Sequence, residues 1–309
     1  MGRKLPPDKL TLMTGDDESQ TTKTIQLQDG RKLGYAEYCA LHGRPLLHFH
    51  GWPGSRLEAR LVAEPAARAG VRLIGVDRPG MGLSDFMPGR TILDWVDDVV
   101  ELVDALGQDR FAIEGISSGG VYAIACAYKI PHRLTACSII SGMGPFEAGL
   151  EGMKFRNRSA LIVAKHTPWL LRPLLWGIMG RYRHDQSKIN ALLLKMDREL
   201  PAPDRKLFLN PEVRQHLAAA TKEAFRQGTR GLAYDGRLLT QPWGFRLGDI
   251  TCNNIYLWHG VLDVDVPVSM ARFVADAIPD CRARFFPQDG HISVPYTYPE
   301  EIWATMDFC

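Results

Sequence analysis

The chain has 309 residues, of which 45% are hydrophobic and 23% charged, with 37 Lys and Arg against 35 Asp and Glu. This length suffices for one large domain or two ordinary ones with a sizeable core. The formal charge of +2 is small for this length, so neither nucleic acid nor a membrane is an expected partner.

Targeting signals are the next feature to consider. Residues 1–22 are polar and contain prolines, so we expect a loose N-terminal arm rather than a secretory signal. The most apolar stretch, 161–179, is interrupted by charges and prolines, whereas a membrane span needs about 20 predominantly apolar residues. The six cysteines form no CxxC pair, which favours reduced thiols in a cytoplasmic protein.

Apolar runs of strand length recur along the chain. Two alternating segments around Asp29-Gly30 predict a hairpin. Six further short runs follow, at 45–50, 71–77, 111–117, 134–141, 253–260 and 283–287. Most are continuously apolar, as in strands covered on both faces. We therefore predict an α/β fold with a mostly parallel sheet of about eight strands flanked by helices.

Helical patterns lie between these strands. Thr91 and Asp94 form a capping-box-like start, and apolar residues follow at helical spacing. A second helix is predicted over 121–129, and the segment 145–248 is largely helical in pattern and too long for a loop. We expect an arm over 1–22, a core over 23–144 and 249–309, and a helical cap over 145–248 inserted between two strands.

The pentapeptide from Gly115 to Gly119 has the form G-x-S-x-G and stands between a predicted strand and a predicted helix, the setting of a nucleophile elbow. The residues two before and two after the nucleophile must be nearly free of side chain in so sharp a turn. This register selects Ser117 over Ser118 as the predicted nucleophile, because centring on Ser118 would put Ile116 at a small-residue position.

A serine hydroxyl needs a base, and that base needs a carboxylate to orient it. His291 lies in a loop after the last predicted strand, from which it could reach Ser117. Asp263 follows another strand and is the favoured carboxylate, with Asp265 as its rival in the same turn. For His48, His50 and His259, which lie at strand ends, a structural hydrogen-bonding role is expected.

The oxyanion of an acyl-transfer reaction needs N–H donors. The backbone N–H of Ser118 stands at a helix N-terminus, where the dipole also favours negative charge. The second donor is predicted to be the N–H of Trp52, in the loop after the strand that ends at His50.

Four motifs now occur in order: His50–Gly54, Asp77–Ser84, the Ser117 elbow, and the Asp263 and His291 pair. Together they resemble the α/β-hydrolase superfamily from about residue 24 onward, and most closely its cap-bearing branch of serine hydrolases. The resemblance implies a Ser117–Asp263–His291 triad and a cap formed by 145–248. Asp77 and Ser84 are expected to hold the turn around Gly80 and Gly82. The family says little about substrate.

The predicted function is hydrolysis of a carboxylic ester or lactone of a small to medium hydrophobic substrate through an acyl-enzyme. Trp52, Trp169 and Trp176 are expected to bind this small-molecule substrate, because a cap encloses the site. No metal or organic cofactor is expected, and the sequence gives no oligomeric state. Two alternatives stay open: a C–C bond hydrolase with the same triad, and a non-hydrolytic small-ligand receptor on this fold.

Overall fold

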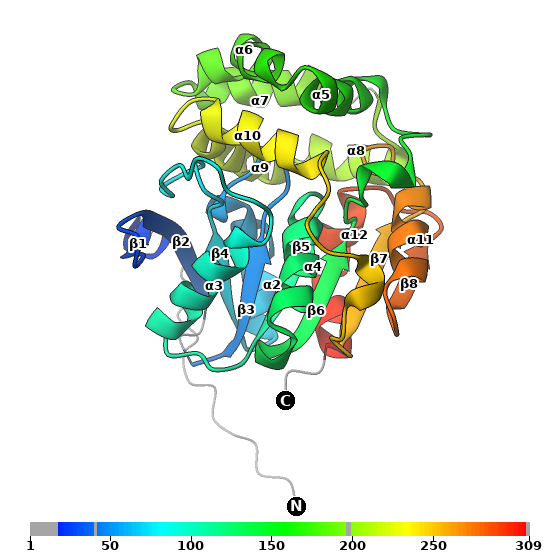
Figure 1. Ribbon diagram of the computed structural model, residues 1–309. Helices are drawn as coiled ribbons and strands as arrows, with labels where there is room; N and C mark the ends of the chain where they lie inside the picture. Colours follow the sequence, from blue (N-terminus) through cyan, green and yellow to red (C-terminus); the bar gives the residue numbers. More distant parts are fainter. Residues whose placement is uncertain (1–17, 40–41, 196–198, 307–309) are drawn as a thin grey trace, which may run out of the picture.

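The structure is a computed structural model that describes residues 18–39, 42–195 and 199–306 (Figure 1). Nearly all of the predicted N-terminal arm therefore lies outside the described residues. Eight strands are present: β1 (Lys23–Gln26), β2 (Lys32–Cys39), β3 (Arg44–Phe49), β4 (Val71–Val76), β5 (Phe111–Ile116), β6 (Leu134–Ile140), β7 (Ile255–Gly260) and β8 (Arg282–Phe286). They agree with the predicted apolar runs to within a few residues.

The strands form one sheet in the order β1-β2-β4-β3-β5-β6-β7-β8. The β1–β2 hairpin is antiparallel, β2 also runs antiparallel to β4, and all the remaining pairs are parallel. The predicted fold class is thus confirmed. The register pairs Ile116 with Ile140 and Ile140 with Trp258, so β5, β6 and β7 end level at one edge of the sheet.

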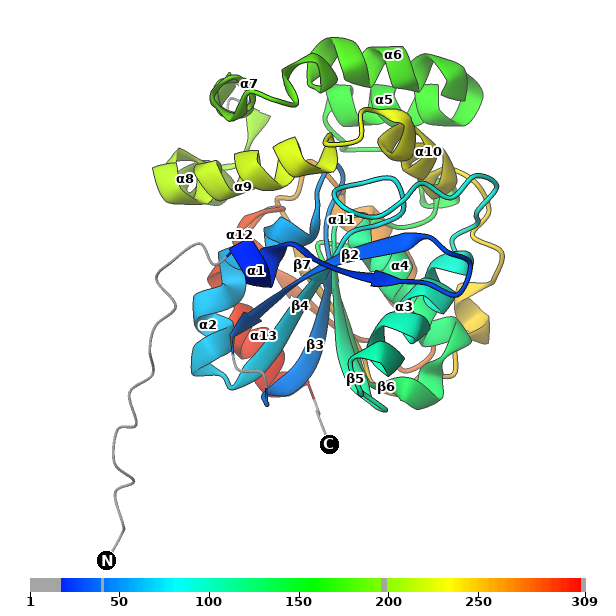
Figure 2. The ribbon, with the colours of Figure 1, turned by 90° about the vertical axis from the view of Figure 1, so that its left-hand side faces the viewer.

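Both faces of the sheet are covered, which explains the continuous apolar runs. Phe111 and Ile113 of β5 enter one hydrophobic cluster, while the intervening Ala112 enters the other. Figure 2 shows the helices on the two sides of the sheet. Those that pack on the sheet are α2 (Ala63–Arg68), α3 (Asp94–Ala105), α4 (Gly119–Lys129), α11 (Val268–Ala277), α12 (Ser293–Thr297) and α13 (Pro299–Thr305).

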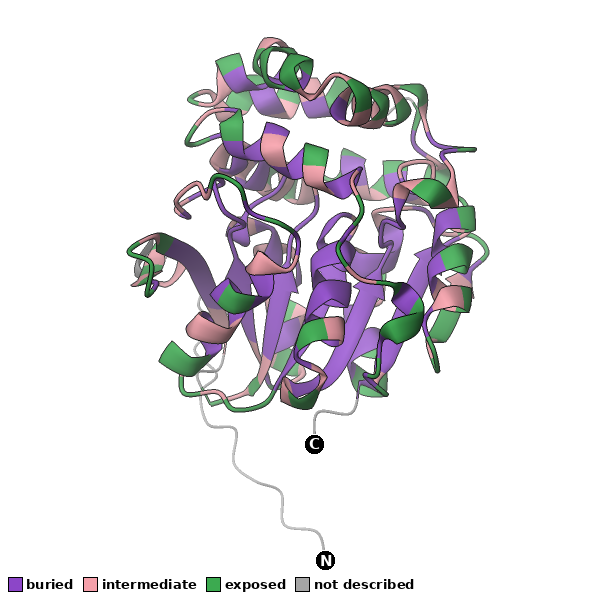
Figure 3. Ribbon diagram, viewed as in Figure 1, coloured by how far each residue is buried: buried purple, intermediate pink, exposed green. Residues whose placement is uncertain are grey.

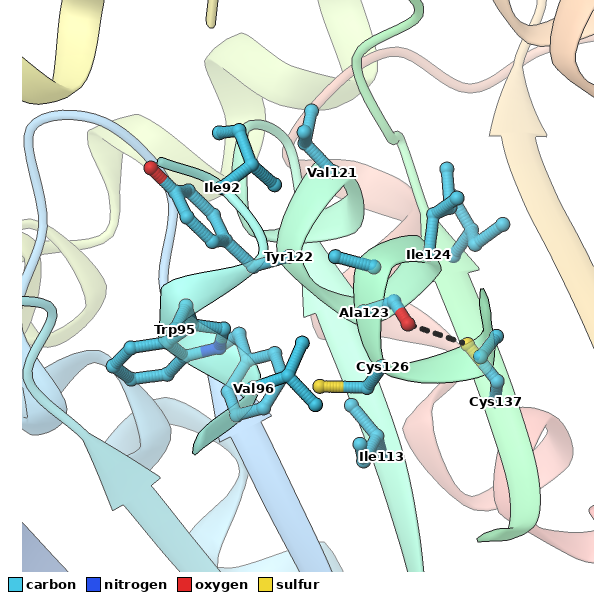
Figure 4. Close-up of a cluster of buried hydrophobic side chains, with 14 of the residues drawn as sticks. Ile92, Trp95, Val96, Ile113, Val121, Tyr122, Ala123, Ile124, Cys126 and Cys137 are labelled. Carbon is cyan, nitrogen blue, oxygen red and sulfur yellow. Dashed lines mark hydrogen bonds between the residues drawn. The ribbon is translucent and has the colours of Figure 1, made fainter. Parts of the chain in front are cut away.

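Helix α4 lies in the hydrophobic core, with its residues 119–127 all buried. Figure 4 shows side chains of α4 between α3 on one side and β5 and β6 on the other. Trp95 of α3 meets the ring of Tyr122 edge to face, with centroids 5.9 Å apart. The Cys137 thiol on β6 donates to the carbonyl of Ala123 at 3.5 Å. This packing fixes the position of α4, which begins directly after the Ser117-Ser118 turn.

The predicted start of the helix after Thr91 is also found. The Thr91 N–H donates to Asp94 Oδ2 at 2.6 Å, and the Asp94 N–H donates to Thr91 Oγ1 at 3.4 Å. This reciprocal pair satisfies two backbone donors that the first turn of α3 leaves free.

A second layer of helices lies above the edge where the parallel strands end (Figure 1). We use the word cap for this layer, which comprises α5 (Phe155–His166), α6 (Pro168–Ile178), α7 (Gln186–Lys195), α8 (Ala202–Leu209), α9 (Pro211–Ala224) and α10 (Arg230–Leu239). All six fall in the segment predicted as the cap insertion, between β6 and β7. No described helix is both long and apolar enough to cross a membrane.

Candidate active site

Ser117 stands in the sharp turn between β5 and α4, and its φ of 56° is in the left-handed region that side chains rarely adopt. Its N–H donates to Ile140 O at 3.0 Å, and its own carbonyl accepts from Met143 N at 3.0 Å. A Cβ at Gly115 would overlap the Gly119 carbonyl, and one at Gly119 would overlap the Phe49 carbonyl. The surrounding backbone therefore holds a strained residue here, as a nucleophile elbow requires.

Asp263 and His291 are brought together from the loops after β7 and β8. His291 Nδ1 lies 2.7 Å from Asp263 Oδ2. The other carboxylate oxygen of Asp263 accepts the N–H groups of Asp265 and Val266, each at 2.8 Å. The structure records no hydrogen bond between His291 and Ser117, although catalytic hydrogen bonds often tighten only when a substrate binds.

The rival carboxylate, Asp265, has other partners. It accepts from Asn157 Nδ2 at 2.6 Å and pairs with the Lys154 ammonium. Both of these partners come from the start of the cap. The geometry thus distinguishes two neighbouring aspartates: Asp263 contacts the imidazole, whereas Asp265 ties its loop to the cap.

The electrostatic environment of His291 is dominated by carboxylates. Burial lowers the pKa of its imidazole, but the Asp263 carboxylate outweighs that effect, and with Asp265 and Asp204 it raises the pKa to about 9. The nearby His259 has the opposite shift, because burial lowers its pKa. Its Nε2 lies 2.9 Å from the Val266 carbonyl, so it supports the turn that presents Asp263.

A cap residue, Asp204, holds the backbone of the His291 loop. Its carboxylate accepts the N–H groups of His291 at 2.7 Å, Ile292 at 3.1 Å and Ser293 at 2.8 Å. The side chain is fully buried, at 0% exposure. An aspartate of α8 therefore fixes the loop that carries the imidazole, a contact that sequence reasoning missed.

The backbone next to each predicted oxyanion donor lies close to Ser117. Ser118 precedes the first residue of α4, and the Gly51 backbone approaches Ser117 so closely that a Cβ on Gly51 would lie 3.4 Å from the Ser117 Cβ. The Gly51 N–H donates to Glu58 Oε1 at 3.0 Å. Among the described residues, neither the Trp52 nor the Ser118 N–H has a hydrogen-bond acceptor.

Comparison with known proteins identifies the family of this chain. The chain matches the α/β hydrolase fold family over residues 44–296. It belongs to that family. A pimeloyl-[acyl-carrier protein] methyl ester esterase of Legionella pneumophila (strain Paris) is 37% identical over 266 residues, covering 85% of this chain and 93% of the relative.

Two more distant similarities extend the comparison. A 2-hydroxymuconate semialdehyde hydrolase of Pseudomonas putida is 25% identical over 235 residues, 71% of this chain and 70% of that one. Among solved structures, an esterase from Rhodococcus sp. ECU1013 superposes with a TM-score of 0.64 at 20% identity, over 92% of this chain and 97% of that one. Together with the L. pneumophila relative, the P. putida relative supports a hydrolase, and the structural similarity supports the fold.

A buried charge cluster beside the loop that follows β3 joins the α/β-hydrolase core to its cap. Arg78 donates from its guanidinium to the His50 carbonyl, to Gly51 O at 3.1 Å and to Ser118 Oγ at 3.2 Å. Asp235 of α10 lies 3.2 Å from this guanidinium and accepts from Arg90 at 2.6 Å. The two arginines and the aspartate are essentially excluded from solvent.

The sequence gives no local signal for Asp204 or Asp235. Asp204 is 87 residues from His291, and Asp235 is 157 residues from Arg78. Each is a single aspartate in an amphipathic helix, where a solvated position is the ordinary expectation. Only the position of the cap over the core reveals that both point inward.

The hydrolase turn from Asp77 to Ser84 has the structural role expected of it. Asp77 Oδ2 accepts from Leu83 N at 2.9 Å, and Ser84 Oγ donates to the Asp77 carbonyl at 2.7 Å. Gly82 has a φ of +49°, and a Cβ there would overlap the Asp77 carboxylate. The turn is thus wound around a buried carboxylate that admits only glycine at this position.

The three predicted substrate-binding tryptophans lie in different places. Trp52 is half-buried below α10 and donates from Nε1 to Leu232 O at 3.0 Å, so it stands between the Ser117 region and the cap. Trp169 and Trp176 are 71% and 55% exposed on α6, the uppermost helix in Figure 1. Their placement gives no support to the prediction that they line the pocket.

Metal and thiol chemistry have no candidate site in the described parts of the hydrolase. No group of three or more His, Cys, Asp or Glu side chains there is arranged to hold a metal ion. The five described cysteines are free, and burial raises the pKa of the Cys39 and Cys281 thiols to about 11, which keeps them protonated.

Proposed function

We propose that the protein is a serine hydrolase that cleaves a carboxylic ester or lactone of a small to medium hydrophobic substrate. The observation that carries the proposal is the strained Ser117 at the sheet edge where His291 is hydrogen-bonded to Asp263. A strained serine in an elbow and an imidazole oriented by a carboxylate are two of the three parts of acyl-transfer catalysis.

The proposed reaction has two halves. Ser117 Oγ attacks the carbonyl carbon while His291 takes its proton, and the N–H groups of Trp52 and Ser118 stabilise the oxyanion. His291 then protonates the leaving alcohol, which departs as the tetrahedral intermediate collapses to the acyl-enzyme. A water deprotonated by His291 attacks that ester, and Ser117 leaves with the proton.

Support for the substrate class comes from the relatives and from the apolar cap. The L. pneumophila relative is named for hydrolysis of a methyl ester. The underside of the cap contributes buried Leu171, Leu175 and Leu232 to a cluster against which Trp52 packs. We also propose a cytoplasmic location, because free thiols are typical of that compartment.

Replacement of the nucleophile tests the mechanism. Ser117→Ala is expected to abolish hydrolysis of p-nitrophenyl acetate and labelling by a fluorophosphonate probe. Ser118→Ala is the matched control, because its proposed contribution is a backbone N–H that alanine retains, so it should still be labelled. Turnover at the wild-type rate by Ser117→Ala would exclude the proposed nucleophile.

C–C bond hydrolysis is the second candidate, and the P. putida semialdehyde hydrolase supports it. It would use the same three residues on a substrate such as 2-hydroxymuconate semialdehyde. Comparing kcat/KM for this semialdehyde with that for short esters distinguishes the two activities. Fluorophosphonate labelling without turnover on either panel would instead favour a small-ligand receptor.

A further inference from the structure

The outer surface of the cap carries an unusual concentration of apolar side chains. Trp169 is 71% exposed and Trp176 is 55% exposed. Apart from Arg172, the exposed residues of α6 are apolar, and at about 100° per residue most of them lie on the arc opposite the buried Leu171 and Leu175. We call this arc the docking face; it consists of Trp169, Leu170, Pro173, Leu174 and Trp176.

A surface helix of a globular protein ordinarily presents polar residues to solvent, so this helix needs a partner for its second apolar side. Figure 3 shows exposed segments along α5 and α6 at the top of the molecule, on the side of the cap remote from the sheet. Folding has buried Leu171 and Leu175 and has left the docking face uncovered.

The chain segment that carries the docking face has charged side chains of one sign only, whereas Arg226 beside it pairs with Glu223 of α9 at 3.5 Å. Between residues 155 and 184 the chain has six Lys and Arg and no Asp or Glu. None of the six forms an ion pair with a described residue. A cavity of about 540 Å³ beside α6 is lined by Arg172, Arg183, Arg226 and Arg230 together with Trp176.

We propose that the docking face binds the surface of an anionic phospholipid bilayer. The two tryptophans would enter the interface between headgroups and acyl chains, and the arginines of the cavity would contact lipid phosphates. Tryptophan beside arginine on an amphipathic helix is the composition that interfacial binding uses. The net charge of the whole chain is near zero and does not reveal this local excess of Lys and Arg, so no membrane partner was expected from the sequence.

Two other occupants fit the observations less well. A second copy of the chain would bring two uncompensated cationic faces together across a symmetric interface, where like charges repel. An acidic protein surface would match the charge, but it would not shield from water the apolar rings of Trp169 and Trp176, which are 71% and 55% exposed. A bilayer matches both the charge and the apolar residues.

Vesicle sedimentation tests the proposal, and the Ser117→Ala chain serves as the parent so that binding is measured apart from catalysis. We expect sedimentation with vesicles containing phosphatidylglycerol, weak binding to phosphatidylcholine alone, and loss of binding at high salt. The double variant Trp169→Ala/Trp176→Ala and the double variant Arg172→Glu/Arg183→Glu should each weaken binding by at least about tenfold.

A matched control carries the same kinds of change elsewhere. Phe273→Ala/Arg246→Glu alters an apolar residue that is 39% exposed on α11 and an exposed arginine outside the cap, and it should bind like its parent. No sedimentation with anionic vesicles at low salt would overturn the proposal. Binding that depends on the arginines but not on the tryptophans would overturn it in favour of adsorption by charge alone, and a dimer that dissociates in the tryptophan variant would overturn it in favour of self-association.

Discussion

Three carboxylates surround one imidazole at the site. Asp263 is hydrogen-bonded to the His291 imidazole, and Asp204 accepts the backbone N–H of His291. Asp265 acts on the imidazole through its charge, which the Lys154 ammonium partly balances. The raised pKa of His291 follows from this arrangement. At neutral pH the imidazole is therefore largely protonated in the free protein, a state that cannot accept the Ser117 proton.

This arrangement predicts an alkaline rise in activity. As pH increases from 6.5 to about 9, deprotonation of His291 should increase kcat/KM. Asp265→Asn removes one carboxylate charge and leaves Lys154 unpaired, so it should move the rise to lower pH. Asp249→Asn, at an exposed position, should leave the profile unchanged. A wild-type profile already level at pH 6.5 would contradict this account.

A second buried histidine affects stability rather than rate. His48 Nδ1 lies 2.7 Å from Glu114 Oε1, and its Nε2 lies 3.6 Å from Glu58 Oε1. Burial lowers the pKa of His48, but the two glutamates outweigh this and raise it to about 9. Because Glu58 also accepts the Gly51 N–H, this charge network contacts the loop that follows β3.

The sign of the resulting pH dependence follows from the raised pKa. The folded state holds the His48 proton more tightly, so the stabilisation is complete below pH 6.5 and is lost as pH rises to about 9. Its size is at most about 3 kcal/mol. Urea unfolding at both ends of this range should show a smaller loss of unfolding free energy in His48→Gln than in wild type. Equal losses would show that His48 is neutral in the fold.

At the scale of elements, helix α8 of the cap contacts the loop that carries His291 through Asp204. Asp204→Asn keeps the size of the side chain but replaces one acceptor oxygen with a donor that faces backbone N–H groups. We expect kcat to fall by about 10- to 100-fold with little change in KM, since small displacements of a catalytic group have large effects.

The pH profile separates positioning of His291 from a general loss of structure. Removal of the Asp204 charge should also move the alkaline rise to lower pH, which simple unfolding would not do. Asp185→Asn is the control: Asp185 lies in the cap and pairs with Lys188, and its replacement should change neither kcat nor the pH profile. A kcat loss without a shift of the profile would assign Asp204 a purely structural role.

Local patterns predicted the elements well because their causes are local. Thr91 and Asp94 are three positions apart in the sequence, and the steric demand on Gly115 and Gly119 acts within one turn. The face on which a cap helix is buried depends instead on distant packing. The apolar pattern of 161–179 therefore suggested tryptophans inside a pocket, whereas the structure places Trp169 and Trp176 on the outside.

At the scale of the whole molecule, the cap and the core share a buried cluster of two arginines and one aspartate. Asp235 is the only carboxylate in the described hydrogen bonds of Arg78 and Arg90, and Tyr122 OH also donates to it at 2.5 Å. Two cations then share one anion in the interior. Such a cluster is sensitive to loss of the single shared partner.

Asp235→Ala should therefore destabilise the protein by about 3 to 5 kcal/mol, because it leaves two buried guanidinium groups without a counter-charge. Asp235→Asn should lose less, since it keeps an acceptor. Urea unfolding followed by circular dichroism and by tryptophan fluorescence measures the change, with Glu212→Gln at an exposed site of α9 as control. Coincident curves in wild type and separate curves in Asp235→Ala would show that this cluster makes the cap and core unfold together.

The chain leaves β6 to form the cap and returns to β7, and these two strands are neighbours in the sheet. Because the chain leaves and re-enters the sheet at adjacent strands, the cap can be exchanged without changing the sheet topology. A cap from another protein could therefore be grafted here without altering any strand pairing. Asp204 and Asp235 set the condition for such a chimera. A foreign cap would have to supply a carboxylate at each of these two places. Without them, the backbone N–H groups of the His291 loop would lose their acceptor, and the buried Arg78 and Arg90 would lose their counter-charge.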